Sequence, residues 1–567
     1  MARWHDGTMR LSAAVFCALG TAAGGQTTPK FTLGPALQVN PPGDVWFECS
    51  IGVSQTNHLE AFVGSMSPTT PGIATAAIFA LPGGPLVAHG NTSCGTTDPW
   101  VAPEPGPLGR IWLTALDGSG VVGTPPTNCA SGIYVGWKNA GQGSIPAAQL
   151  YPVPGLDGLF DKPALAIGEE TPGGPLNRFY ITSVAKRGVY CNRTVNLATT
   201  SNNPASGAPV WAVKEVKPVH HNDCDWKGWG AVGVVTSSGR IVAALTDGDP
   251  QNNANRPYMY YSDDQGATWH SDDGLDPLVI DPDENIEATT IDVDDTSGCS
   301  GSQSGDTPEH ADRRQGAPSI AIDRSQEPNH IYVAFYARSA PGAKNTDIYI
   351  ARSTDAGTTW PSDEIVQITD AMLGLTDPVD TDPITGADQY TPAIAVDSCG
   401  GVNLMFYDNR FDPDRDDKYS PMDVYFARVT NFGPPPVVPV VNTARMTSET
   451  FPADHCTMPV MASYLGDYQT MSVSADGKWI WAAYIARESD QALGWTERNC
   501  YVHRIQIHCL QEGDFNGDGG VNEADASEFL AALAAEDPSA DIDLDWYVTD
   551  ADFDLFMERY DRGRRGD

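Results

Sequence analysis

The feature that most constrains the fold of this chain is an eight-residue motif that occurs twice. Residues 262–269 and 353–360 both fit the pattern Ser-x-Asp-x-Gly-x-Thr-Trp, and each copy follows a short apolar strand. At such a corner the Asp carboxylate accepts backbone N–H bonds, the Gly adopts a positive φ and the Trp covers the turn. The motif therefore predicts β-hairpins that repeat along the chain. Residues 474–477 form a degenerate third copy.

The hairpins belong to a longer repeat, in which one apolar strand is followed by a turn and a second apolar strand. The segments are rich in Val, Ile, Tyr and Trp and are bounded by Gly, Pro, Asn or Asp, which is typical of strands. The pairs are 50–53 with 59–63, 100–102 with 111–116, 164–167 with 179–182, 231–235 with 241–245, 319–322 with 331–336, 393–396 with 402–407, and 470–473 with 479–484. Third strands are expected at 133–137, 259–261, 348–351, 424–427 and 501–505.

A closed ring of four-stranded blades would explain how so many strands avoid long exposed edges. We therefore expect an all-β fold, a six- or seven-bladed β-propeller. The blade number stays open because the first strand pair could complete the last blade. An array of β-sandwiches is the structural alternative.

The N-terminus predicts export. Arg3 and Arg10 flank a short polar stretch, and Leu11 to Ala23 is an apolar run that ends in small residues, so residues 1–23 are expected to be a signal peptide. No other stretch approaches the about 20 apolar residues of a membrane-spanning helix. Cys17 lies in this segment, and the even number of remaining cysteines predicts disulfides whose connectivity stays open. We expect a secreted protein, with attachment to the cell surface as a further expectation.

The charge of the chain is strongly negative. It has 73 acidic and 34 basic residues, which gives a formal net charge of −39. Such a surface repels phosphate backbones, so nucleic acid is not an expected partner. Divalent cations are expected partners of such a surface.

The strand repeats and the two motif copies resemble the sialidase-like superfamily, whose Asp-box repeats carry this motif. The resemblance covers about residues 45–508, and we expect a propeller domain at 24–510. It implies that the Asp-box residues are structural, because in that family the boxes lie at the blade periphery, away from the ligand. It also implies a glycan or glycoprotein as the ligand.

The same resemblance raises the alternative of an exo-α-sialidase or a related glycoside hydrolase. Such enzymes use three arginines on the substrate carboxylate, a Tyr nucleophile assisted by Glu, and an Asp acid/base. Tyr468, eight residues before Asp476-Gly477, and Arg410, after a strand, are the matching candidates. The simpler interpretations are an aromatic wall for Tyr468 and a salt bridge with Asp408 for Arg410.

Two departures from the family pattern favour a binding protein over an enzyme. The usual Arg-Ile-Pro motif is absent, and Arg110-Ile111-Trp112 is only a partial match. The expected Glu ahead of the Arg410 strand is also missing, with Asp388-Gln389-Tyr390 in its place.

A second domain is expected at 511–567, where two loops have the spacing of calcium ligands. In the first, position six is Gly519, as the sharp turn of a calcium loop requires, and a helix with an apolar face follows. The second loop has Trp546 at position six, which predicts weaker binding or altered geometry. The expected ligands are Asp514, Asn516, Asp518, Gly520, Asn522 and Asp525 in the first loop, and Asp541, Asp543, Asp545, Tyr547, Thr549 and Asp552 in the second.

These paired loops, each ending in Asp and followed by one helix, resemble a type I dockerin, a small paired EF-hand-like helical module. The resemblance implies that Ca²⁺ folds the module and that its helices bind a cohesin-like protein. The recognition pairs are Glu523-Ala524 and Asp550-Ala551, which depart from the best-known Ser/Thr pairs. A calcium-stabilised cap without a partner is the alternative.

Overall fold

Strands with alternating and continuous apolar runs form most of the chain. The structure, a computed structural model, describes residues 31–67, 73–81, 84–92, 97–117, 132–153, 160–169, 177–186, 193–200, 211–216, 229–249, 254–270, 278–279, 318–338, 346–374, 387–411, 420–453, 466, 468–487, 498–508, 513–516 and 520–565. In this part of the chain the strands make seven antiparallel sheets of four or five strands each.

The first four sheets follow the sequence in order. They contain β3 (Phe47–Val53), β4 (Glu60–Met66), β5 (Ala74–Leu81) and β6 (Gly84–Asn91); β7 (Thr97–Pro103), β8 (Ile111–Asp117), β9 (Gly132–Lys138) and β10 (Leu150–Pro152); β11 (Phe160–Glu169), β12 (Asn177–Lys186), β13 (Arg193–Thr200) and β14 (Trp211–Val216); β15 (Trp229–Val235), β16 (Ile241–Asp249), β17 (Ala254–Ser262) and β18 (Leu278–Val279).

The last three sheets follow, and the two short N-terminal strands join the last of them. They contain β19 (Ser319–Asp323), β20 (His330–Arg338), β21 (Thr346–Ser353) and β22 (Ile365–Ile368); β23 (Gln389–Val396), β24 (Val402–Asp408), β25 (Ser420–Thr430), β26 (Val440–Arg445) and β27 (Phe451–Ala453); β28 (Thr470–Val473), β29 (Trp479–Arg487), β30 (Arg498–Ile507), β1 (Phe31–Leu33) and β2 (Leu37–Gln38). Short 3₁₀ helices are η1 (Ala147–Gln149), η3 (Ser362–Glu364) and η4 (Pro538–Ala540).

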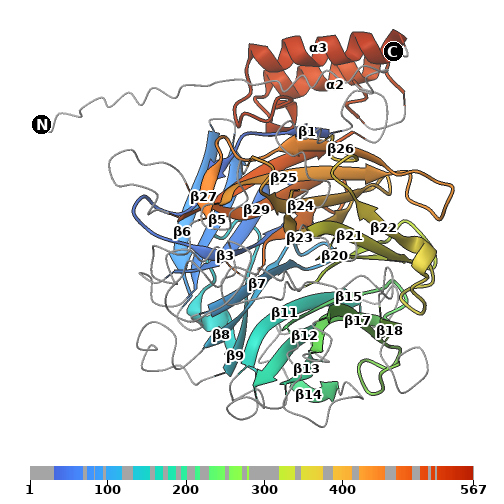
Figure 1. Cartoon of the computed structure of the whole chain (residues 1–567). Helices are drawn as coiled ribbons and strands as arrows, with labels where there is room; N and C mark the ends of the chain where they lie inside the picture. Colours follow the sequence, from blue (N-terminus) through green and yellow to red (C-terminus); the bar gives the residue numbers. More distant parts are fainter. Residues whose placement is uncertain are drawn as a thin grey trace, which may run out of the picture.

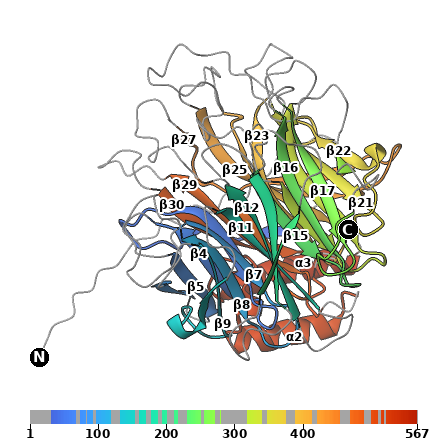
Figure 2. The ribbon, with the colours of Figure 1, turned by 90° about the horizontal axis from the view of Figure 1, so that it is seen from below.

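The seven sheets close into a ring. The first strand of each sheet contacts the first strand of the next, from β3 through β7, β11, β15, β19 and β23 to β28, and β28 contacts β3 again. Figures 1 and 2 show the sheets arranged around a common centre. The expected all-β propeller is thus confirmed, and of its two blade numbers the sheet topology gives seven.

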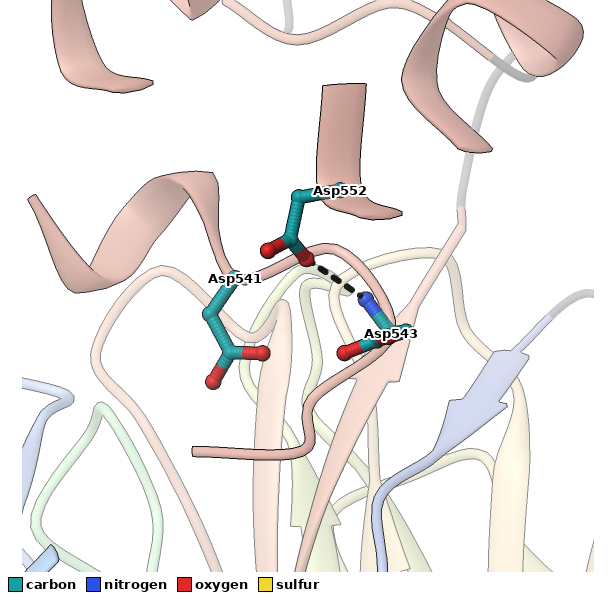
Figure 3. Close-up of side chains that lie close together, drawn as sticks. All are labelled: Asp541, Asp543 and Asp552. Atoms are coloured by element: carbon teal, nitrogen blue, oxygen red, sulfur yellow. Dashed lines mark hydrogen bonds between the residues drawn. The ribbon is translucent and has the colours of Figure 1, made fainter. Parts of the chain in front are cut away.

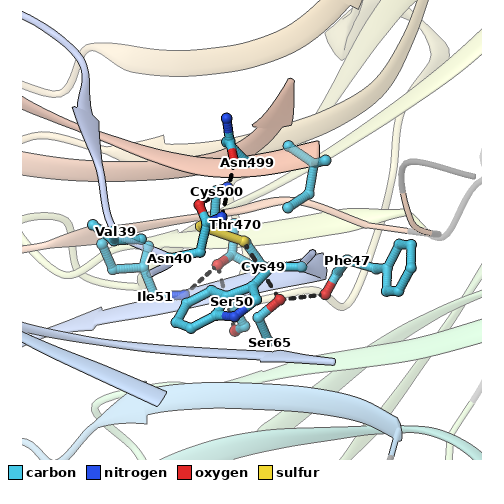
Figure 4. The surroundings of a disulfide bond; sticks show 12 residues. Val39, Asn40, Phe47, Cys49, Ser50, Ile51, Ser65, Thr470, Asn499 and Cys500 are labelled. Carbon is cyan, nitrogen blue, oxygen red and sulfur yellow. Dashed lines mark hydrogen bonds between the residues drawn. A yellow bond between two sulfur atoms is a disulfide. The ribbon is translucent and has the colours of Figure 1, made fainter. Parts of the chain in front are cut away.

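The ring is closed by the N-terminal segment. The first predicted strand pair forms a sheet of its own, and β1 instead pairs with β30 to complete the last sheet. A disulfide between Cys49 on β3 and Cys500 on β30 also joins the first sheet to the last (Figure 4). The expectation that this chain forms disulfides is met at this pair.

Hydroxyl side chains join neighbouring first strands. These strands have no hydrogen-bonded strand on their inner side, so their N–H groups need other acceptors. The Ser50 hydroxyl accepts from Val101 N at 2.8 Å, and the Thr470 hydroxyl accepts from Ile51 N at 2.8 Å. At the centre of the ring, side-chain hydroxyls therefore accept the backbone N–H bonds that strand carbonyls accept inside each sheet.

The two Asp-box motifs form the corners that the sequence predicts. Asp264 Oδ1 accepts from Thr268 N at 2.7 Å, and these bonds hold the pKa of Asp264 at about 2. Gly266 has a φ of +80°, which a glycine adopts without strain. Both motifs lie between the third and fourth strands of their sheets, whereas the degenerate copy at 474–477 lies between a first and a second strand.

The C-terminal module consists of α2 (Glu523–Ala534) and α3 (Asp550–Arg565), which lie beyond β1 in Figure 1. Its core contains Phe529 and Phe556, whose rings stack at a centroid distance of 4.0 Å. Asn522 caps α2 through its bond to Ala524 N. Within the described residues, neither helix combines the length and apolar character needed to span a bilayer.

Candidate metal centre

The second predicted calcium loop brings three of its carboxylates together. One oxygen from each of Asp541, Asp543 and Asp552 lies within 4.8 Å of the others (Figure 3). Asp541 and Asp543 come from the loop after η4, and Asp552 comes from the first turn of α3. The loop thus folds back on the helix so that positions one, three and twelve converge.

This donor set fits a hard divalent cation. Calcium prefers carboxylate and carbonyl oxygens at about 2.3–2.6 Å, and oxygens around one such ion lie about as far apart as these three. Asp541 Oδ1 is buried and has no hydrogen-bond partner within the described part of the chain. Asp545, Tyr547 and Thr549, the remaining expected ligands of this loop, lie on its exposed side.

Burial makes these carboxyls weaker acids than usual. Burial is the largest cause that raises the pKa of Asp541 to about 7 and the pKa of Asp543 to about 6. Neighbouring carboxylates of the same loop raise both values further. A bound divalent cation would reverse this effect, because it favours the ionised form of each ligand.

The tryptophan at position six does not prevent the loop from turning. Trp546 has a φ of +76°, in the left-handed region where a calcium loop normally places glycine. Such a conformation costs a non-glycine residue about 1 kcal/mol or more. Its indole is only 6% exposed and packs against Trp481 at 5.7 Å, so burial offsets the strain.

The first loop repeats the hydrogen bonds of the second. In the first loop, the backbone N–H groups of Asn516 and Asn522 donate to the two oxygens of Asp525 at 3.1 and 2.9 Å. The same two positions of the second loop donate to the two oxygens of Asp552 at 3.3 and 2.7 Å. The described ligand positions of the first loop are Asp514, Asn516, Gly520, Asn522 and Asp525, and Asp518 and Gly519 lie outside the described residues.

Tyr468 lies at the end of the propeller where the first strands begin. Its side chain is 8% exposed, its hydroxyl donates to the carbonyl oxygen of Pro99 at 2.6 Å, and its ring lies 5.5 Å from Trp100. The residue therefore joins the start of the seventh sheet to the first strand of the second sheet. This contact agrees with the interpretation of Tyr468 as part of an aromatic wall.

Arg410 is held by its neighbour. Its Nε and Nη2 donate to the two oxygens of Asp408 at 2.7 and 2.8 Å, so the predicted salt bridge is confirmed. The guanidinium also lies over the ring of Tyr425 at 3.5 Å. Arg410 follows the second strand of the sixth sheet and Tyr468 precedes the first strand of the seventh, so both lie at the same end of the propeller.

A group of carboxyls near Arg410 was not found from the sequence. Burial raises the pKa of Asp347 to about 7 and also raises the pKa of Asp370. Asp347 is the second residue of the third strand of the fifth sheet and Asp370 follows its last strand, so both lie at the same end as Asp388 and Asp408 of the sixth sheet. Only the strand order of the sheets would have shown that these carboxyls lie at one end, because the residues form no sequence motif.

Comparisons with known proteins add little. No family model matches the chain, and no curated protein matches it. It is similar to solved structures of a Hadza microbial sialidase Hz136 (12% identity, 78% of this chain, 75% of that chain, TM-score 0.36) and of a PL25 ulvan lyase (11%, 81%, 95%, 0.38). A third is the GH93 α-L-arabinofuranosidase of Fusarium graminearum (11%, 60%, 91%, 0.31). At these TM-scores the likeness carries no argument about the chain's function.

Proposed function

We propose that this chain is a secreted, calcium-binding β-propeller that recognises glycans or glycoproteins. The observation that carries the calcium part is the convergence of Asp541, Asp543 and Asp552. The repeated hydrogen bonds in the first loop support a second site of the same kind. Bound calcium would neutralise the buried carboxylates and fix both loops, so the module would gain stability from the ion.

Calcium titration of the purified chain tests this proposal. We expect two calcium ions per chain, and we expect Asp543→Asn to abolish one of the two binding events. Asp554→Asn is the matched control, because this exposed carboxyl on α3 is not at a ligand position. Absence of calcium uptake by a folded wild-type chain at millimolar calcium would contradict the proposal.

The glycan part of the proposal is supported by a difference in connection length between the two ends of the propeller. Connections between first and second strands are short, as at 236–240, 397–401 and 474–478. The longest connections, including 280–318, leave from the opposite end, where Tyr468 also lies. Ligand-binding residues concentrate on loops that a rigid scaffold positions, so we place the glycan site at this end.

Binding to immobilised glycans in calcium tests this second part. We expect Trp100→Ala to weaken binding about tenfold, because an aromatic ring beside Tyr468 would stack on a sugar face. Trp137→Ala in the second sheet is a control for general destabilisation. The alternative, an exo-α-sialidase, would be established if the chain cleaves a fluorogenic sialoside and both Tyr468→Phe and Arg410→Ala abolish this activity. Weakening of glycan binding only in the control would contradict our placement of the site.

The C-terminal module offers a further contact. The pairs Glu523-Ala524 and Asp550-Ala551 are exposed at the starts of α2 and α3. We propose these positions for a cohesin-like protein, which would attach the secreted chain to the cell surface.

A further inference from the structure

The second loop makes an ion pair with the propeller itself. Arg504 lies on β30 with its side chain fully buried, and its Nη1 donates to Asp541 Oδ2 at 2.9 Å. Asp541 is position one of the second loop. Within the described residues, it is the carboxylate that pairs with Arg504. A buried guanidinium without such a partner would be strongly unfavourable, so the propeller depends on the module for this charge.

Aromatic rings from both domains enclose the same guanidinium. Its carbon lies 5.1 Å from the ring of Trp479 on β29 and 5.0 Å from the ring of Trp546 in the second loop. Trp546 belongs to the same hydrophobic cluster as the propeller core. The indole at position six of the loop is therefore part of the propeller's packing, which explains why a large residue occupies this position.

Two glycines of the propeller leave room for the same loop. A Cβ on Gly34 would lie 2.8 Å from the Cβ of Leu544, and a Cβ on Gly84 would lie 2.9 Å from the ring of Tyr547. Gly34 N also donates to the carbonyl oxygen of Arg504 at 2.9 Å. The contact is thus built from both sides, around Arg504.

A cavity of about 250 Å³ lies beside this contact. Its lining includes His58 and Trp479 on the propeller, Asp514 of the first loop and Ile542 of the second loop. Both loops of the module therefore face the propeller around this cavity.

We propose that the second loop is a metal-linked clamp that fixes the C-terminal module to the seventh sheet. Arg504 and a divalent cation would hold opposite oxygens of Asp541. This inference rests on the calcium binding proposed above, and it adds a propeller residue to the surroundings of that site. The occupant of this face of the module is the chain's own seventh sheet.

The two oxygens of Asp541 support this division. Oδ2 accepts from Arg504 and from Trp546 N at 3.2 Å, whereas Oδ1 has no partner in the described part of the chain. A cation at Oδ1 would also bind Asp543 and Asp552, and would thereby hold the loop in the shape that presents Trp546. Because linkage is reciprocal, calcium strengthens docking of the module to the same extent that docking strengthens calcium binding.

Hydrogen exchange of the full chain tests the clamp. In calcium, we expect Arg504→Met to speed exchange of residues 31–38 and 541–552 at least about tenfold, because docking holds both segments closed. The first loop should still bind calcium, and exchange in β11–β18 should not change. Chelation of calcium from the wild-type chain should speed exchange of the same two segments. Arg504→Lys, which keeps the charge, should retain part of the protection.

The controls separate the clamp from general damage. Arg352→Met removes an arginine of the fifth sheet that also pairs with an acid, Glu364, and lies over a ring, that of Phe432. We expect it to leave both segments protected. Trp546→Ala disturbs the contact from the module side and should reproduce the Arg504→Met result. Unchanged exchange in Arg504→Met and Trp546→Ala, with calcium bound in both loops, would overturn the clamp and leave calcium binding intact. If calcium binds neither loop, the underlying calcium proposal fails instead.

Discussion

Replacing Glu60 by alanine is expected to lower the free energy of unfolding by about 3–5 kcal/mol, because it leaves a buried lysine without its partner. The Lys138 side chain is fully buried and its ammonium contacts Glu60 Oε1. Gly141 N donates to both carboxylate oxygens, at 3.0 and 3.1 Å. Burial lowers the pKa of Lys138, in keeping with the cost of burying this charge between the first two sheets.

A double variant distinguishes the loss of a partner from the value of the pair. Replacing Glu60 and Lys138 together by Met should restore most of the stability, since well-packed apolar residues often replace a buried pair at little cost. Denaturant unfolding measures all three chains. If Glu60→Ala costs less than about 1 kcal/mol, the pair is more hydrated than its burial indicates.

The second large effect concerns closure of the ring. Cys49 and Cys500 are separated by 451 residues along the chain and are both buried. A disulfide across so long a loop removes much of the entropy of the unfolded chain, so we expect Cys49→Ser with Cys500→Ser to cost about 4–5 kcal/mol. Chemical unfolding of the purified double variant measures this loss.

Alanine at both positions provides the control for this prediction. Ser at a buried position adds an unsatisfied hydroxyl, whereas Ala does not. Agreement between the two double variants would assign the loss to the crosslink itself. A loss below about 1 kcal/mol in the Ala pair would mean that pairing of β1 with β30 suffices to close the ring.

The fold was predictable because strand chemistry repeats. The first and second strands of every sheet lie at the predicted positions, as with 393–396 in β23 and 402–407 in β24. The blade number was not predictable, because it depends on a three-residue strand, β1, that has no pattern of its own. Its pairing with β30 is a contact between the two ends of the ring, which no local signal records.

The candidate site was predictable only in part. Loop spacing identified Asp541, Asp543 and Asp552, because ligand positions in a calcium loop are fixed by the local turn. The partner Arg504 was missed, since nothing in a strand sequence shows which side chain will meet another domain. Trp546 was interpreted as a weakness of the loop. The structure gives it a second role, as packing against the propeller.

The most direct test of the calcium site is an anomalous difference map from crystals of the chain grown in calcium and soaked with a lanthanide. We predict one peak among the carboxylates of Asp541, Asp543 and Asp552, and a second within the loop that ends at Asp525. A map at saturating lanthanide with no peak among the three carboxylates would contradict the account.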